Sequence, residues 1–357
     1  MRRLMRIKCT SIGSNEHGAS SILVGLLMVA LLGFAAISVD VGGLYWEKAQ
    51  LQNGADAGAL ALASICGIDE SDPGCVETSG VPPQLADENA NDATSRVPSI
   101  KLDTANNKVT VVTAGAEPGS PTSTVSTWFA RILDPAFSDV EVGATATAVW
   151  APPPTLISKF PLAFSKCEVD SIPPEDDALS ELRFLRSKGK DPDEYECSYN
   201  TSSGLELEGG FGWLVGAGCS ATTTIGESSQ GVPGNSKPSA CEDTLIKWKK
   251  DLKAGKQVVV LLPVFDDSVG TSEKTYNIYA YAAFEVHGWK FSTGVWDYRP
   301  ADVQAVIDAY QSTVNGGAPE GFVGKFIRYV FDDEDTDFGE DDTNSPDLGA
   351  NVIQLVE

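Results

Sequence analysis

The residues best suited to chemistry lie near the C-terminus, in the acidic sequence DDEDTDFGEDD at 332–342. Asp333, Asp335 and Asp337 alternate as the first ligands of a calcium-binding loop do. However, the glycine follows one position too late, and Asn344 stands where such a loop supplies its glutamate. We therefore predict a solvated loop of mutually repelling carboxylates. The three aspartates are the candidates for a calcium site, and no metal is assigned to them.

His287 is a second candidate, because it is the only histidine that follows the long apolar segment at 18–39. Any Ser-His-Asp or Cys-His mechanism in this part of the chain would have to use it. It lies at the end of an alternating apolar pattern, and no GxSxG sequence accompanies it. We interpret it as a surface histidine near the end of a strand. The sequence therefore predicts no catalytic residue, no cofactor and no enzymatic activity.

The cysteines indicate an oxidising compartment. Cys9 precedes the apolar segment and six cysteines follow it. An even number in an exported chain indicates disulfide bonds. Proximity along the chain favours the pairs Cys66–Cys75, Cys167–Cys197 and Cys219–Cys241, with buried free thiols as the alternative for each pair.

The apolar segment itself is GASSILVGLLMVALLGFAAISV, 22 residues without a charge. As a helix it would be about 33 Å long, which matches the hydrocarbon core of a bilayer. Four basic residues precede it: Arg2, Arg3, Arg6 and Lys8. They predict a single-pass plasma-membrane protein with a cytoplasmic N-terminus and its remaining residues outside. A cleaved signal peptide is the alternative, favoured by the small residues near 35–38 and opposed by the length of the segment.

The residues directly after this segment predict a helix that continues out of the membrane. Asp40 marks the membrane boundary, with Gly42 and Gly43 as a hinge beside it. From 44 to 65, helix-forming residues dominate. Small residues spaced along this stretch would let another backbone approach closely: Gly54, Ala55, Gly58, Ala59 and Ala63. The sequence leaves two partners open for them: a helix of another chain and this chain's own sheet.

The sequence GASSILVGLLMVALLGFAAISVDVGGLYWEKAQLQNGADAGALALA resembles the N-terminal module of TadE/TadG-like proteins of tight-adherence (Flp) pilus assembly. WFARILDPAFSDVEVGATATAV, at 128–149, also resembles that family. Two positions depart from it. Leu23 replaces the glutamate expected five residues after the glycine of a prepilin cleavage site, and Gly43 replaces a frequent arginine. The resemblance thus implies a TadG-type membrane-anchored accessory subunit, with other Tad/Flp pilus assembly proteins as partners.

Composition and patterning predict the fold class. Acidic residues outnumber basic ones by 50 to 26, so binding to nucleic acid is not expected. Helical and strand patterns alternate after the membrane segment, which predicts an α+β protein. We expect the following organisation: 1–17, a cytoplasmic basic segment; 18–39, the transmembrane helix; 40–150, a stalk helix with an α+β Tad-like module; 151–155, a proline linker; and 156–357, a β-rich, disulfide-bonded extracytoplasmic domain.

The expected function is structural: a membrane-anchored accessory subunit that acts through helix packing and its exported domain. The alternative is a cell-surface adhesive or ligand-binding protein that uses the Tad-like segment only as an anchor. An envelope hydrolase is a third possibility, and it would depend on His287.

Overall fold

A computed structural model describes residues 17–170, 182–186, 210–233, 236–270, 274–313, 320–331 and 346–356. The acidic sequence at 332–342, Cys9, Cys197 and the N-terminal basic residues lie outside this part of the chain. The fold class is α+β, as predicted. The chain forms two compact units, and the longest helix contributes residues to each of them.

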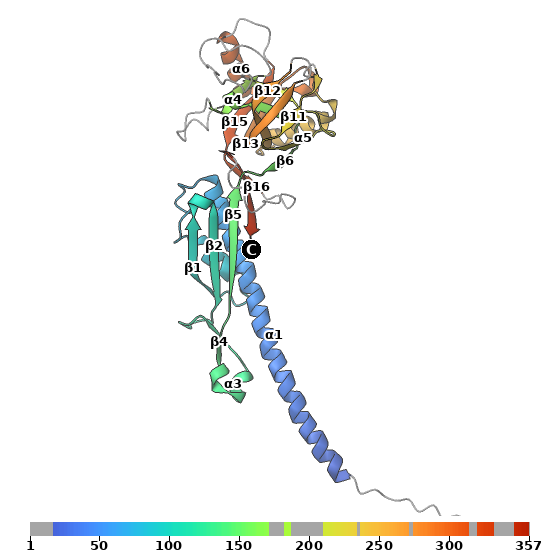
Figure 1. Cartoon of the computed structure of the whole chain (residues 1–357). Helices are drawn as coiled ribbons and strands as arrows, with labels where there is room; N and C mark the ends of the chain where they lie inside the picture. The colour runs from blue at the N-terminus through green and yellow to red at the C-terminus, as the bar shows by residue number, and fades with distance from the viewer. Residues whose placement is uncertain are drawn as a thin grey trace, which may run out of the picture. The chain divides into compact units, whose positions relative to one another are not determined.

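That helix, α1, runs from His17 to Ile68 and contains 52 residues, or about 78 Å of helix. It joins the predicted transmembrane and stalk helices without a break (Figure 1). Gly42 and Gly43 are helical, so the structure shows no interruption where the sequence predicts a hinge. The reason is that glycine weakens a helix by only about 1 kcal/mol and removes no backbone hydrogen bond.

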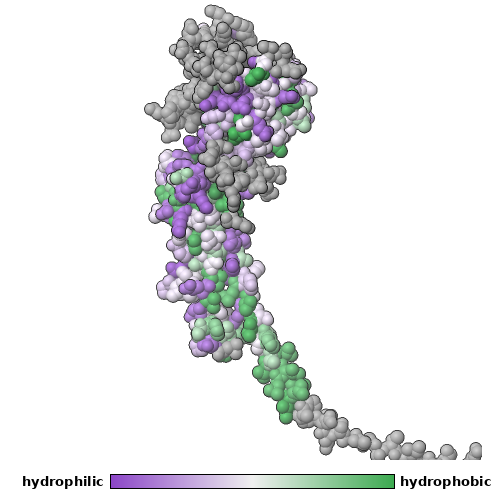
Figure 2. Space-filling view, in the orientation of Figure 1, coloured by the Kyte–Doolittle hydropathy of each residue, from purple (hydrophilic) through white to green (hydrophobic). Residues whose placement is uncertain are grey.

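The first part of α1 is apolar and exposed. From Ile22 to Val39 every large apolar side chain is exposed to solvent. Figure 2 shows the corresponding surface in green. Among the described residues, α1 is the one helix long and apolar enough to cross a membrane. Burial within the chain begins only later, at Asp40 and then at Leu51.

A short second helix and a five-stranded sheet accompany the later part of α1. Helix α2 spans Val81–Asn89. The strands follow the order β1 (Ser95–Asp103), β2 (Lys108–Gly115), β5 (Gly143–Ala151), β18 (Ala350–Val356) and β16 (Tyr329–Phe331). Buried and more exposed residues alternate along β2 and β5, so one face of these strands is covered. The Thr113 hydroxyl on that face donates to the Leu51 carbonyl of α1, at 2.9 Å.

The last strand comes from the far end of the chain. β18 pairs antiparallel with β5, with Val352 opposite Ala151 and Val356 opposite Thr147. β16 then pairs parallel with β18. Residues from both sides of the proline-rich sequence at 151–155 therefore form one sheet.

Between β2 and β5 the chain forms a small hairpin. β3 (Thr124–Ser126) pairs antiparallel with β4 (Asp139–Glu141), and the connection holds α3 (Ala130–Leu133) and a 3₁₀ turn at Pro135–Phe137. The sequence predicts one helix over 125–133, and this prediction is wrong in its first half. Val125 is β-branched and pairs with Val140, so the helix is delayed until Ala130.

The second sheet has nine strands and belongs to the C-terminal half. Its main order is β8 (Arg183–Arg186), β15 (Gly321–Ile327), β13 (Thr275–Lys290), β12 (Val259–Val269), β7 (Leu162–Ser165) and β9 (Phe211–Trp213). Three short strands pair with β13: β11 (Ser228–Gln230), β14 (Asp297–Tyr298) and β17 (Asp347–Leu348). β6 (Thr155–Ser158) and β10 (Ala221–Thr224) form a separate pair.

An aromatic core stabilises this half of the chain. Phe160 lies 5.0 Å from Trp248 of α5 (Glu242–Lys253) and 5.3 Å from Phe322 of β15, measured between ring centroids. Trp213, Phe291 and Trp296 extend the cluster. The remaining α-helices of the described residues are α4 (Lys166–Asp170) and α6 (Ala301–Thr313). Each tilted or edge-on pair of aromatic rings in this core stabilises the fold by about 0.5–1.5 kcal/mol beyond the burial of its surface.

Candidate membrane-proximal interaction site

The small residues predicted for helix contact are covered by the chain's own elements. A Cβ atom added to Gly54 would lie 2.9 Å from the Cα atom of Ala86, and one added to Gly58 would lie 3.0 Å from Cβ of Pro82. Both neighbours belong to α2. Ala55, Ala59 and Ala63 are fully buried. Gly54 and Gly58 therefore meet a helix of the same chain, α2, whereas the sequence left open a helix of another chain or this chain's own sheet.

Asp40 is the next feature, because it is a buried carboxylate on a largely exposed stretch of helix. Only 7% of the surface of Asp40 is exposed. Its two oxygens accept hydrogen bonds from the backbone N–H groups of Trp128 (3.0 Å), Phe129 (2.9 Å) and Ala130 (2.5 Å). These groups lie at the start of α3, where helical N–H groups have no partner within the helix. Asp40 thus caps a helix from 88 to 90 residues away.

The charge of Asp40 is favoured by these contacts. Burial raises the pKa of the carboxyl, but the three N–H groups and the nearby charge of Arg131 outweigh this effect and hold the pKa below its ordinary value. The sequence singles out Asp40 only because it directly follows the predicted membrane segment, and its assignment to the membrane boundary stays a prediction. The sequence did not predict its hydrogen-bond partners Trp128, Phe129 and Ala130, because no local pattern connects residues 88 to 90 positions apart.

The segment that Asp40 holds exposes large apolar side chains. Trp128 is 73% exposed, Ile132 76% and Phe137 57%, and Phe129 is also exposed. On α1, Tyr45 and Trp46 are exposed as well. All of these residues belong to the unit that contains Met1–Ala55 and Val112–Thr145.

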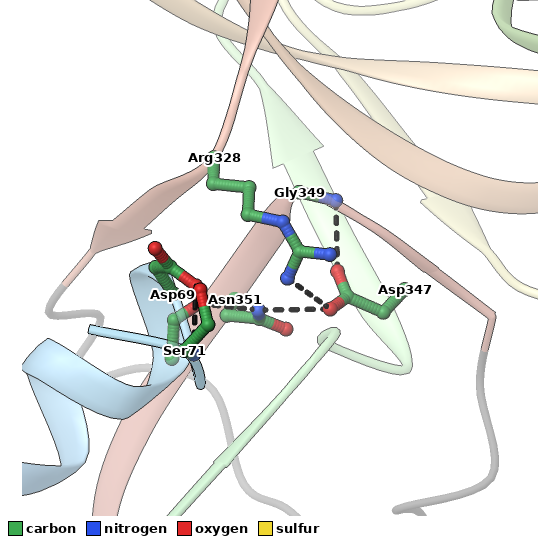
Figure 3. Close-up of polar contacts among 7 residues, drawn as sticks. Asp69, Ser71, Arg328, Asp347, Gly349 and Asn351 are labelled. Atoms are coloured by element: carbon green, nitrogen blue, oxygen red, sulfur yellow. Dashed lines mark hydrogen bonds and ion pairs between the residues drawn. The ribbon is translucent and has the colours of Figure 1, made fainter. Parts of the chain in front are cut away.

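The C-terminal end of α1 belongs to the second unit and is fixed there by polar groups (Figure 3). The buried Asn351 amide donates to the Gly67 carbonyl at 2.9 Å and to Asp347 at 3.4 Å. Asp347 also accepts from Arg328 at 3.3 Å. These contacts satisfy one of the free carbonyls with which every helix ends.

Asp69 follows α1 and turns the chain. Its carboxylate accepts from the hydroxyl and the backbone N–H of Ser71, at 2.7 and 2.8 Å. These two hydrogen bonds lower the pKa of Asp69, and the charge of Arg328 lowers it further. A disulfide between Cys66 and Cys75 closes the same turn.

The other predicted site residues stand as follows. Cys219 and Cys241 form a disulfide, so two of the three pairs favoured by proximity are present. Cys167 is also disulfide-bonded, and its predicted partner Cys197 lies outside the described residues. The same holds for the calcium candidates Asp333, Asp335 and Asp337, whose assignment stays a prediction.

His287 lies on β13, with its side chain 29% exposed. Its imidazole is 3.6 Å from Glu285 and 3.8 Å from Asp302, and Glu285 also pairs with Lys325 at 3.1 Å. These neighbours are the carboxylates of a strand residue and of a residue on α6, together with a lysine on the adjacent strand β15. Within the described ranges, no three His, Cys, Asp or Glu residues are grouped to hold a metal ion.

Comparison with known families bears directly on α1. Residues 18–64 match the family described as putative Flp pilus-assembly TadE/G-like. The match covers the exposed apolar part of the helix, Asp40 and the small-residue face, and it ends just before Cys66. It associates this segment with Flp pilus assembly and, with the apolar helix, indicates membrane anchoring. No curated protein and no solved structure matches the chain.

The close contact between α1 and α2 predicts that a larger side chain at position 54 disturbs their packing, whereas a larger side chain at position 43 does not. Gly54→Leu should force α2 away from α1 and destabilise this packing by about 1–3 kcal/mol. Gly43→Leu is the matched control, because a Cβ there meets nothing within 4 Å. Limited proteolysis should cleave the segment at 69–94 faster in Gly54→Leu alone. Equal cleavage of both variants would contradict the observed packing.

The hydrogen bond at the end of α1 gives a second prediction. Asn351→Ala leaves the Gly67 carbonyl without its partner and should lower the free energy of unfolding by about 1–3 kcal/mol. Asn53→Ala, an exposed position on α1, should change it by less than about 0.5 kcal/mol. Chemical denaturation of the solubilised chain measures both. The prediction fails if the two variants unfold alike.

The lowered pKa of Asp40 predicts how pH affects α3. The carboxylate stabilises the folded state fully above the ordinary aspartate pKa of about 3.9, and this contribution is lost as pH falls through the lower pKa of the folded protein. Hydrogen exchange at Trp128, Phe129 and Ala130, corrected for intrinsic rates, should therefore show protection down to about pH 4 that declines below it. Asp40→Asn should reduce the protection at neutral pH and remove its dependence on pH.

Proposed function

We propose that this chain is a membrane-anchored structural subunit of tight-adherence (Flp) pilus assembly or of a related cell-surface machine. The observation that carries the proposal is the family match at residues 18–64, on a helix whose apolar part has exposed side chains. In this arrangement residues 18–39 cross the plasma membrane, the N-terminus is cytoplasmic and residues 40–357 are exported. The basic residues before the apolar segment and the disulfides after it support that orientation.

The surface that contacts partner subunits differs from the one that the sequence suggested. Gly54 and Gly58 face α2, so a partner helix cannot occupy their face while α2 remains in place. The apolar face at 21–39 is a better candidate. Gly25 and Gly33 have no neighbour within 4 Å, which leaves room for another backbone to approach in the membrane. We propose helix contacts along this part of α1 as the working interaction.

The full-length chain is the appropriate material for a test. A fragment that begins after Ala151 would keep β16 and β18 but lose β5, with which β18 pairs. We expect the intact chain to co-purify with Flp pilus assembly proteins after mild crosslinking. Replacing residues 18–39 by an unrelated apolar helix of equal length should keep the chain in the membrane and reduce that co-purification several-fold.

A control variant makes the result interpretable. Gly43→Ala, which lies outside residues 18–39 and whose added Cβ meets nothing within 4 Å, should leave partner recovery unchanged. The helix-contact proposal is wrong if the replaced-helix variant recovers the same partners as the native chain. Recovery of no pilus component, together with specific binding of a ligand by the intact chain, would instead favour the adhesive alternative.

A further inference from the structure

Residues 128–137, WFARILDPAF, expose an unusual concentration of apolar surface, and we call this segment the foot. Trp128, Phe129, Ile132 and Phe137 are all exposed within ten residues. Isolated exposed apolar residues are normal on proteins, but a cluster that includes two phenylalanines and a tryptophan usually marks a surface of interaction. The cluster is built on a hydrogen-bonded frame, so its exposure does not come from an unfolded end.

The position of the foot on α1 is fixed by Asp40. The carboxylate accepts hydrogen bonds from the backbone N–H groups of Trp128, Phe129 and Ala130. Asp40 directly follows Val39, the last residue of the apolar segment. If residues 18–39 fill the hydrocarbon core, Asp40 lies where that core meets the headgroups. The start of the foot therefore lies at the same depth.

The side chains of the foot suit that depth. Tryptophan is enriched at membrane–water interfaces because its ring is apolar and its N–H is polar. Tyr45 and Trp46 lie five and six residues beyond Asp40, about 8–9 Å farther along α1, and are also exposed. Aromatic side chains thus occur on both the helix and the foot close to the proposed edge of the hydrocarbon core.

The charge of the foot narrows the chemistry of its partner. It carries one arginine and one aspartate, so its formal charge is zero. Attraction to anionic lipids is therefore not its main source of binding energy, in contrast to polybasic membrane anchors. The main source of binding energy is the burial of apolar side chains among headgroups and upper acyl chains.

We propose that the foot inserts into the lipid–water interface beside the membrane helix and forms a second contact with the same bilayer. This inference rests on the proposed anchoring of residues 18–39. The two contacts, linked through Asp40, would restrict the rotation of α1 about its own axis and fix which side of the helix faces a neighbour.

The test places an environment-sensitive fluorophore at single cysteines in the full-length chain, in phosphatidylcholine vesicles and with Cys9→Ser as background. Ile132→Cys reports on the foot, Leu31→Cys on the membrane helix, and Ile246→Cys on an exposed apolar position of α5. We expect blue-shifted emission and several-fold stronger quenching by headgroup-labelled lipids at Ile132→Cys than at Ile246→Cys. Leu31→Cys should be quenched by lipids labelled deep in the acyl chain.

The outcomes distinguish the foot from the anchor. A water-like signal at Ile132→Cys with a lipid-like signal at Leu31→Cys overturns the inference and leaves the anchoring intact. Water-like signals at both positions overturn both. A signal at Ile132→Cys that shifts only when other envelope proteins are added identifies a protein-docking surface and also overturns the inference.

Two further variants exclude a trivial loss of structure. Trp128→Ser with Ile132→Ser keeps the backbone N–H groups that bind Asp40, so hydrogen-exchange protection at 128–130 should persist. A fluorophore at Phe137→Cys in that variant should lose its blue shift.

Replacement of phosphatidylcholine by anionic lipid should change the quenching at Ile132→Cys by less than about two-fold, since the foot carries no net charge. A strong dependence on anionic lipid would contradict insertion driven by apolar burial.

Discussion

The central constraint on this protein is that one helix presents two surfaces with different requirements. Up to Val39, α1 carries large exposed apolar side chains, which are stable in lipid. From Leu51 onward its small residues are buried against elements of the same chain. A Cβ on Gly54 or Gly58 would crowd α2, so this second surface is fitted to contacts within the chain. Each part of the helix is therefore suited to one environment and unsuited to the other.

Asp40 lies between these two parts and explains how they are joined. A charged carboxylate is costly in hydrocarbon and is acceptable at its edge. Here the carboxylate also accepts hydrogen bonds from three backbone N–H groups. The residue that follows the apolar segment is therefore also bonded to the folded part of the chain. The hairpin of β3 and β4 is thereby connected to α1 at a defined level of the helix.

The sequence predicts much of this arrangement because the relevant signals are local. Apolar length predicts the long apolar helix, alternation predicts β2, β5 and β13, and close spacing favours the Cys66–Cys75 and Cys219–Cys241 bonds. The family match at 18–64 agrees with the resemblance carried by the same residues. Strand β1, which contains Pro98, lacks a clear alternating pattern and was not predicted.

What the sequence leaves undetermined is the partner of each element. The pattern at 352–356 predicts a strand but does not reveal that it pairs with β5, some two hundred residues earlier. Likewise, small residues on α1 predict close packing without saying against which backbone. The helix predicted over 125–133 is shortened because pairing with β4 competes with it for Val125.

The pairing of β18 with β5 has a consequence for biogenesis. Because the strand that covers the edge of β5 consists of residues 350–356, it becomes available only after the long stretch of chain between β5 and β18 has been synthesised. Until then β5 presents unpaired N–H and C=O groups, which is the kind of edge that quality-control chaperones and neighbouring chains can bind. A polypeptide that stops before residue 350 keeps that edge open, so pairing of this edge of β5 requires that synthesis has reached β18.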